Sequence, residues 1–232
     1  MTYEELALET AKLGLSLSPD TIEKLHRYAV LLKEWNEKMN LTAITEENEV
    51  IEKHFYDSLL AASVYDFSNK KIADIGSGAG FPGMVLALVY PSAKVTLIDA
   101  TKKKFLFLET VVKELQIPNV KFHIGRVEDM KMERETFDCV TSRGFAAMNV
   151  FLEVAAPLTR VNGIIVALKG LRGEEELHAA LNAEQKLDLH LRKRAVLKLP
   201  SGDTRSIFTF EKTRKTSPKY PRPWAEISKK PL

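Results

Sequence analysis

The feature that most constrains the fold is an alternation of short apolar runs with helix-like runs, which begins near residue 70. The apolar runs are strand-like in length and are rich in β-branched residues; they read "KIADI", "KVTLID", "VKFHIG", "FDCVTSR" and "GIIVALKG". Helix-like runs such as "PGMVLALVY", "TKKKFLFLETVVKEL", "NVFLEVAAPL" and "EEELHAALNAEQ" alternate with or follow them. Alternating strands and helices form βαβ units, so the pattern predicts a mostly parallel sheet covered by helices.

The end of this region changes character. Two strand-like runs, "LDLHLRKRAVLKL" and "RSIFTFEK", are joined by the turn signal "PSGD". Such a pair predicts an antiparallel hairpin. We therefore expect a parallel sheet that closes on an antiparallel hairpin.

The chain before this region is predicted to be helical. Ser18 and Pro19 form an N-cap and first-turn pair, and we expect Thr45 to cap a later helix that carries "KHFYDSLLAA". Three parts follow: a helical extension packed on the core (1–66), an α/β domain (67–213) and a basic tail (214–232).

Composition narrows the class of protein. The chain has 232 residues, enough for one α/β domain with an extension. Cys139 is its only cysteine, which excludes an internal disulfide framework and a cysteine metal cluster; we predict no metal site. The start "MTYEELALET" lacks the features of a signal peptide, and no apolar run reaches the ~18 residues of a membrane span. We expect a cytoplasmic protein with no membrane partner.

Positive charge is concentrated at the end of the chain. Residues 201–232 contain eight Lys and Arg against three Asp and Glu, although the whole chain carries only +3. Such a distribution favours an anionic partner for the tail. A tail that serves only solubility is the alternative.

The stretch "DIGSGAGFPG", from Asp74 to Gly83, lies between a predicted strand and a predicted helix. Ligands of open α/β folds bind at this edge of the sheet. A P-loop is excluded because no Gly-Lys-Ser/Thr ends the stretch. A dinucleotide and S-adenosylmethionine remain, and the literal G-x-G-x-x-G at Gly78, Gly80 and Gly83 fits the former.

The other residues of this loop favour S-adenosylmethionine. Asp74 stands two residues before Gly76, and a carboxylate there suits a cationic sulfonium and ammonium better than a pyrophosphate. Phe81 and Pro82 would place a ring and a rigid imino acid in the tight turn that a pyrophosphate needs. Asp99, at the end of the second strand, suits the ribose hydroxyls of either cofactor.

A further loop, "GRVEDM", follows the third strand. Val127, Glu128 and Asp129 are candidates to lie along the edge of an adenine. A solvated turn is the alternative for Glu128 and Asp129.

In this order along the chain, "NLTAI", "HFYDSL", "DIGSGAGFPG", "TLIDATKKKFLFL", "VEDM", "TSRG", "LKG" and "KYPR" make the sequence resemble the RsmG (GidB) family of bacterial 16S ribosomal RNA methyltransferases. The resemblance covers nearly the whole chain. It implies the class I S-adenosylmethionine-dependent methyltransferase fold, Rossmann-like, with a mostly parallel seven-stranded sheet and a C-terminal antiparallel hairpin. It also implies methyl transfer to N7 of one guanine in the decoding-region loop. We expect a monomer that acts on 16S ribosomal RNA or on the small ribosomal subunit.

The resemblance also implies cofactor contacts. Matched motif by motif, these fall on Gly76, Phe81, Val127, Glu128 and Arg143. Together with the loop and the acidic residue of the second strand, the predicted cofactor-binding set is Asp74, Gly76, Ser77, Gly78, Gly80, Phe81, Asp99, Val127, Glu128 and Arg143.

Two other methylation chemistries lack their residues. Cys139 lies inside a predicted central strand, so a cysteine nucleophile for pyrimidine C5 is not expected. "TSRG" stands where exocyclic-amine methyltransferases commonly carry an Asn/Asp-Pro-Pro-aromatic motif. Guanine N7 has a free lone pair and no proton, so alignment of the reactants is the main requirement. We hypothesise that no side chain is an obligatory acid, base or nucleophile.

Three side chains are candidates for the guanine pocket: His54, Asp57 and Arg143. His54, Asp57 and Ser58 share one helical face by their spacing. The alternative is a hydrogen-bonded set that orients this helix on the core, with Arg143 as an ordinary surface charge.

The RNA-binding candidates are cations predicted to lie on loops or on the tail, namely Lys169, Arg172, Arg205, Lys219 and Arg222. Tyr220 and Trp224 are expected to stack on unpaired bases. The chain departs from the family pattern after "KYPR", where "PWAEIS" replaces a common glycine-containing turn, and at Gly144, where alanine is usual. A dinucleotide-dependent oxidoreductase and a non-catalytic ribosome assembly factor with a cofactor pocket are the alternative functions.

Overall fold

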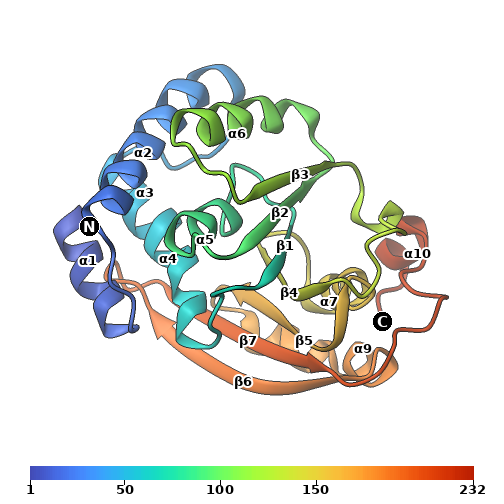
Figure 1. Ribbon diagram of the computed structural model, residues 1–232. Helices are drawn as coiled ribbons and strands as arrows, with labels where there is room; N and C mark the ends of the chain where they lie inside the picture. The colour runs from blue at the N-terminus through green and yellow to red at the C-terminus, as the bar shows by residue number, and fades with distance from the viewer.

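A seven-stranded sheet forms the centre of the computed structural model, which describes residues 1–232 (Figure 1). The strand order is β3-β2-β1-β4-β5-β7-β6, in which β1 to β5 pair in parallel and β7 is antiparallel to both neighbours. The predicted parallel sheet and closing hairpin are therefore confirmed. The strands are β1 (Lys71–Ile75), β2 (Lys94–Asp99), β3 (Val120–Ile124), β4 (Phe137–Arg143), β5 (Thr159–Lys169), β6 (Leu189–Lys198) and β7 (Thr204–Lys212).

Helices cover both faces of the sheet, and a separate hydrophobic cluster lies under each layer. One layer contains α5 (Gly83–Val89) and α6 (Lys102–Glu114), with the N-terminal helices packed outside them. The other contains α7 (Met148–Ala155), α8 (Gly173–Ala179), α9 (Leu181–Lys186) and α10 (Trp224–Lys229). The central strands β1 and β4 are covered on both faces, which explains why most of their residues are buried.

The N-terminal residues form α1 (Tyr3–Lys12), α2 (Pro19–Met39), α3 (Glu47–Val50), the π-helical turn η1 (Ile51–Tyr56), α4 (Asp57–Leu59) and the 3₁₀ turn η2 (Leu60–Ser63). Ser18 caps α2 as predicted, because its hydroxyl accepts a hydrogen bond from the Thr21 amide. The prediction for Thr45 is wrong: the residue at the N-cap of α3 is Glu46, and its side chain makes no capping hydrogen bond.

The segment predicted as one helix over "EEELHAALNAEQ" is two short helices, α8 and α9. Ala180 is buried and separates them, with backbone angles (φ −93°, ψ 2°) that interrupt the helix. The two halves pack against different strands, α8 against β7 and α9 against β6. Packing on two strands thus overrides the helical pattern of the sequence.

Residues 214–232, predicted as a basic tail, are folded onto the core. Tyr220, Ile227 and Leu232 are buried in the cluster beneath α7. The segment contains α10, drawn in red at the side of the molecule opposite the N-terminal helices (Figure 1). The residues that depart from the family pattern after "KYPR" are the ones that form this helix.

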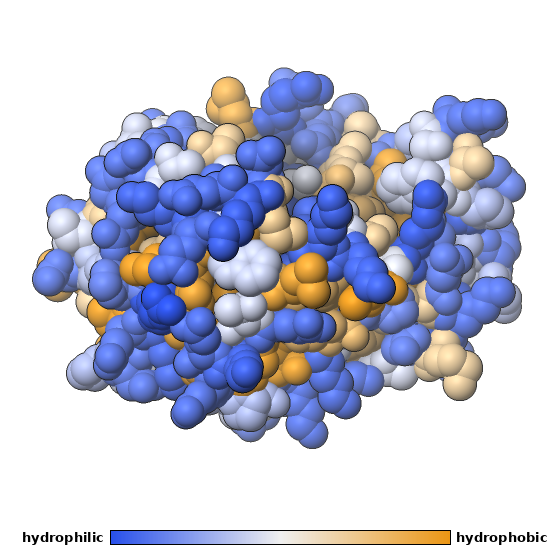
Figure 2. Space-filling model, turned by 90° about the horizontal axis from the view of Figure 1, so that it is seen from above, coloured by the Kyte–Doolittle hydropathy of each residue, from blue (hydrophilic) through white to orange (hydrophobic).

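The face of the molecule seen from above is covered mainly by hydrophilic side chains, with some hydrophobic ones between them (Figure 2). None of the helices combines the length and apolar character needed to span a membrane. No group of three or more His, Cys, Asp or Glu side chains is placed to bind a metal ion.

Candidate active site

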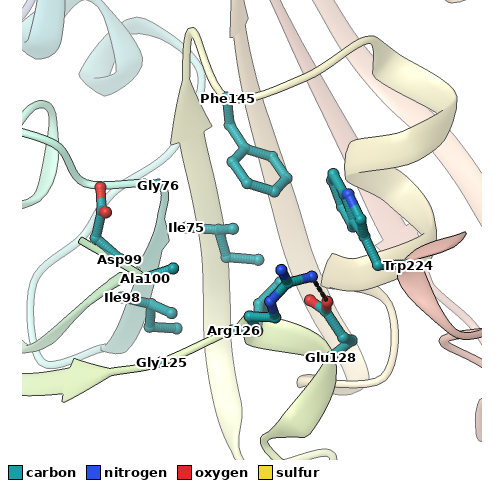
Figure 3. Close-up of a pocket in the computed structure, with 11 residues that line it drawn as sticks. Ile75, Gly76, Ile98, Asp99, Ala100, Gly125, Arg126, Glu128, Phe145 and Trp224 are labelled. Carbon is teal, nitrogen blue, oxygen red and sulfur yellow. Dashed lines mark hydrogen bonds and ion pairs between the residues drawn. The ribbon is translucent and has the colours of Figure 1, made fainter. Parts of the chain in front are cut away.

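A cavity of about 260 Å³ lies at the carboxyl edge of the parallel strands (Figure 3). Ile75 ends β1, Ile98 and Asp99 end β2, and the loops after β3 and β4 close the sides. A neighbouring element, α10, reaches the same cavity. The lining residues are Ile75, Gly76, Ile98, Asp99, Ala100, Gly125, Arg126, Val127, Glu128, Phe145 and Trp224. The site is mostly apolar with a few polar groups, as is usual for small-molecule pockets.

The glycine loop after β1 is held against β2. The amides of Gly76 and Ser77 both donate to the Ile98 carbonyl, at 2.8 and 3.1 Å. Gly76 has a φ of +70°, and a Cβ atom there would lie 2.6 Å from Cδ2 of Phe145. Glycine is therefore needed at this position both for the backbone conformation and for the approach of the Phe145 ring.

Asp99, at the end of β2, lies beside the glycine loop at the cavity. Its carboxylate accepts hydrogen bonds from the Gly78 amide (3.0 Å), the Thr101 amide (2.8 Å) and the Lys104 ammonium (3.0 Å). Burial acts to raise the pKa of Asp99, but the hydrogen bonds from Thr101 and Lys104 and the charge of Lys104 outweigh it, so that the pKa lies below its ordinary value. Asp99 is thus an ionised acceptor that lines the pocket; its role as a ribose partner stays a prediction.

Asp74 has a different place from the predicted cofactor contact. It is completely buried and does not line the cavity. One carboxylate oxygen accepts a hydrogen bond from the Gly83 amide at 2.8 Å, which ties the start of α5 to β1. Burial raises the pKa of Asp74 to about 7. Its other oxygen and the Ser77 hydroxyl are buried without a hydrogen-bond partner.

The remaining residues of the glycine loop support the site from behind. Ser77, Gly78, Gly80 and Phe81 do not line the cavity. The Tyr28 hydroxyl, from α2, donates to the Ala79 carbonyl, so the N-terminal extension holds this loop in place. The Phe81 ring lies between Tyr28 and His54, with centroid distances of 5.5 and 4.4 Å.

A second polar cluster adjoins the pocket through the β4 loop. Arg143, at the end of β4, donates to the Lys53 carbonyl at 2.9 Å and to Asp57 Oδ2 at 3.0 Å. Arg205, on β7, donates to the other oxygen of Asp57 at 2.9 Å. The Lys53 carbonyl belongs to η1, and π-helical turns are frequent at functional sites. The predicted grouping of His54, Asp57 and Arg143 is therefore present in the structure.

His54 is neutral in this cluster. Arg143 Nη2 lies 3.1 Å from His54 Nδ1, and because arginine has no acceptor, Nδ1 carries no proton. His54 Nε2 lies 2.9 Å from the Thr42 hydroxyl, which accepts a hydrogen bond from Nε2–H. Burial and the charge of Arg143 lower the pKa of His54 to about 3. His54 is thus held as one tautomer, stacked on Phe81, and is not placed to act as a general acid at neutral pH.

Comparison with known proteins identifies the family of the chain. The model of the GidB family, rRNA small subunit methyltransferase G, matches residues 21–204. The chain is similar to the ribosomal RNA small subunit methyltransferase G of Exiguobacterium sibiricum, with 41% identity over 100% of both chains. It is 44% identical to the protein of that name from Desulfitobacterium hafniense over 97% of this chain and 95% of that one, and 40% identical to that of Bacillus subtilis over 100% and 99%.

The chain belongs to the rRNA small subunit methyltransferase G family. Solved structures agree on the fold alone. A SAM-dependent methyltransferase from Aquifex aeolicus superposes with a TM-score of 0.56 at 15% identity, over 74% of this chain and 97% of that one. The TYW2 protein of M. jannaschii, in complex with AdoMet, gives a TM-score of 0.52 at 17% identity, over 84% and 78%. The predicted family and the class I methyltransferase fold are confirmed.

For this family member, four of the ten predicted cofactor residues line the cavity: Gly76, Asp99, Val127 and Glu128. The others brace the loop or, in the case of Arg143, lie in the neighbouring cluster. Residue-type reasoning did not identify Phe145, which follows Gly144 after β4. Its position was detectable, since it lies in the loop that ends a parallel strand at the same edge of the sheet.

Four of the five predicted RNA-binding cations form ion pairs within the protein: three of these pairs are partly buried, and the fourth, Arg172 with Glu175 at 3.2 Å, is exposed. Arg205 pairs with Asp57, and Arg222 pairs with the completely buried Glu153 of α7. Lys169 pairs with Glu176 at 2.8 Å and donates to the Ala146 carbonyl, which holds the loop after β4. The prediction that these side chains lie on loops or on the tail is also wrong for Lys169 and Arg205, which lie in β5 and β7. Arg172 and Lys219 are exposed.

The two aromatic residues predicted to stack on RNA bases, Tyr220 and Trp224, lie in different surroundings. Tyr220 is buried in the core beneath α7, so its ring is not available to a base. Trp224 lines the cavity next to Phe145, with ring centroids 6.1 Å apart. The prediction for Tyr220 is therefore wrong. Cys139 is buried in β4, as predicted.

Proposed function

We propose that this protein transfers a methyl group from S-adenosylmethionine to N7 of a guanine in the decoding-region loop of 16S ribosomal RNA. The observation that carries the proposal is the pocket formed by the glycine loop, Asp99 and the Val127–Glu128 turn in a member of the rRNA small subunit methyltransferase G family. The family defines the class of reaction, and the pocket supplies a site for the methyl donor.

The residues present fit this cofactor. Asp99 is an ionised acceptor suited to the two ribose hydroxyls. Val127 and the loop after β3 offer a backbone edge and apolar surface for an adenine. When bound, S-adenosylmethionine supplies a methyl carbon activated by its positively charged sulfur.

The chain's own residues then have to orient the base. The guanine N7 lone pair forms the new bond to the methyl carbon as the bond from carbon to sulfur breaks, and the positive charge passes to the base. No proton moves in this step, so no general base is needed. The neutral His54 agrees with this, and both carboxylate oxygens of Asp57 are occupied by hydrogen bonds from Arg143 and Arg205. The side chain of Arg143, at the end of β4, is held by hydrogen bonds to the Lys53 carbonyl and to Asp57.

RNA binding by this protein rests on exposed cations. Arg172 and Lys219 remain candidates for phosphate contacts, since their side chains face solvent. Arg126, which lines the pocket and is itself largely exposed, is a further cation at the site. We propose that the protein acts as a monomer in the cytoplasm, on 16S RNA or on the small subunit.

The test is transfer of labelled methyl groups from S-adenosylmethionine to small-subunit RNA, with the modified base mapped by chemical cleavage at N7-methylguanine and by mass spectrometry of nucleosides. The proposal expects one N7-methylated guanine in the decoding region. Label on an exocyclic amine or a pyrimidine, or no transfer, would overturn it.

The two alternative functions are not favoured. A dinucleotide-dependent oxidoreductase does not belong to this family. A non-catalytic assembly factor would use the pocket beside the polar cluster only to bind a ligand.

Single-turnover assays of His54→Asn, Asp57→Asn and Arg143→Lys test the hypothesis that no side chain is an obligatory acid, base or nucleophile. Complete loss of transfer in any one of them, with RNA and cofactor binding intact, would contradict it.

A further inference from the structure

The C-terminal segment is fastened to the core on both sides of α10. Arg222 donates to both carboxylate oxygens of Glu153, at 2.7 Å from Nε and 2.6 Å from Nη2, and its backbone amide donates to the same group at 3.0 Å. Beyond the helix, the side-chain Nδ2 of Asn149 donates to the Leu232 carbonyl at 3.1 Å. Both partners in the core, Glu153 and Asn149, belong to α7.

The residues that precede α10 are also held to the core by hydrogen bonds. The Arg134 guanidinium donates to the carbonyls of Tyr220 at 2.7 Å and of Thr216 at 3.1 Å. Ile227, one turn after Trp224, is completely buried in the cluster beneath α7. Residues on both sides of Trp224 are therefore anchored, and the indole has a defined place.

The indole of Trp224 forms part of the wall of the cavity. Trp224 and Phe145 are its two aromatic side chains, and their rings lie at 56° to each other. In Figure 3, Trp224 stands on the opposite side of the pocket from Asp99, with the Arg126–Glu128 pair below it. The predicted ribose partner and this indole thus face the same space from two distant parts of the chain.

We propose that Trp224 is a binding residue for the adenine of the methyl donor, and that α10 is the closing wall of the cofactor pocket. The inference rests on the proposed function, because it assumes an adenosyl cofactor in this cavity. An aromatic wall suits a purine, since every base presents a flat π-face for stacking. The pairing of Arg222 with Glu153 removes the cation nearest in sequence to Trp224 from phosphate binding.

The sequence provides a matched pair of probes, because Trp35 and Trp224 are the two tryptophans. Trp35 lies in α2 against Phe107 and does not line the cavity. The experiment titrates the wild type, Trp35→Phe, Trp224→Phe and Trp224→Ala with S-adenosylhomocysteine and with S-adenosylmethionine. Affinity is measured by calorimetry, and indole emission is recorded in parallel. Affinity for a decoding-region RNA fragment is measured separately.

The proposal expects an emission change on ligand addition in the wild type and in Trp35→Phe, and none in Trp224→Phe. Trp224→Ala should bind both adenosyl ligands about tenfold more weakly, which corresponds to ~1.4 kcal/mol, while RNA affinity is unchanged. Trp224→Phe should retain most of the affinity, since it keeps a ring. Circular dichroism and thermal unfolding verify that each variant is folded.

Unchanged ligand affinity in a folded Trp224→Ala, or an emission change that persists in Trp224→Phe, would overturn the inference and leave the proposed function standing. Loss of RNA affinity with ligand affinity unchanged would also overturn it, and would place the indole on the RNA. Failure of the wild type to bind either adenosyl ligand would instead overturn the proposed function, and this inference with it.

Discussion

Arg222 and Glu153 form a bidentate ion pair in which the carboxylate is completely buried in α7. The pair joins the C-terminal segment to the helix layer that backs β4 and β5. A segment with a local excess of positive charge is in this way made part of the hydrophobic fold, and one of its cations is withdrawn from solvent.

Arg222→Met should lower the free energy of unfolding by about 3–5 kcal/mol, because it leaves the Glu153 carboxylate buried without its partner. Urea denaturation measures this. Arg214→Met is the matched control, since Arg214 is exposed and makes no ion pair. The double variant Arg222→Met/Glu153→Leu should recover much of the loss. Equal effects of the two single variants would contradict the assignment.

Gly76→Ala should weaken binding of S-adenosylhomocysteine, because the new methyl group meets Phe145 and the backbone keeps its positive φ. Gly144→Ala is the control, since Gly144 also has a positive φ (+67°) but has open space around it. Both changes should cost about 1–2 kcal/mol of stability through the backbone. Calorimetry should find a large loss of ligand affinity only in Gly76→Ala, partly rescued by Phe145→Ala. Rescue would be absent if the contact had no effect.

His54 should stay neutral, with its proton on Nε2, down to acidic pH. ¹⁵N chemical shifts of the imidazole follow this directly. Because its pKa is lowered to about 3 in the folded state, the unfolded chain binds a proton that the folded protein does not between pH ~6.5 and that value. Stability therefore falls as pH falls through this window. Single-turnover methyl transfer should show no inflection from His54 near pH ~6.5; an inflection that vanishes in His54→Asn would refute this.

Asp74 should give the opposite dependence of stability on pH. Its pKa is raised from 3.8 to about 7, so between these values the folded protein holds a proton that the unfolded chain has released. The free energy of unfolding should fall as pH rises through the window, and the deficit persists above it. Asp74→Asn, which keeps an acceptor for the Gly83 amide, should flatten the curve in chemical denaturation at several pH values. Asp20→Asn, at an exposed position, should leave the curve unchanged.

Charge reversal at the exposed cations should weaken RNA binding in a salt-dependent way. Arg172→Glu with Lys219→Glu should reduce the slope of log affinity against log salt by about 0.7 for each phosphate of single-stranded RNA that these cations neutralise in the wild type. Filter binding at several salt concentrations measures it. Lys33→Glu with Lys38→Glu, two exposed positions on α2, changes the net charge by the same amount and serves as the control. An identical slope in the wild type and in the double variant would show that Arg172 and Lys219 do not contact RNA phosphates.

Local sequence patterns were sufficient to predict the alternating strands and helices from β1 to β5, the closing hairpin and the place of Asp99 at the pocket edge, whereas the assignment of Gly76 and the Val127–Glu128 turn also drew on the family resemblance. The elements and the place of Asp99 follow from periodicity and from the rule that parallel strands end at one edge of the sheet. By contrast, tertiary packing decides which charged side chains form internal ion pairs and which remain free to bind a partner. Asp57 meets Arg205 across 148 positions and Glu153 meets Arg222 across 69, and no local pattern encodes pairs so far apart. The position of Trp224 at the pocket is likewise tertiary, since it depends on where α7 anchors the end of the chain.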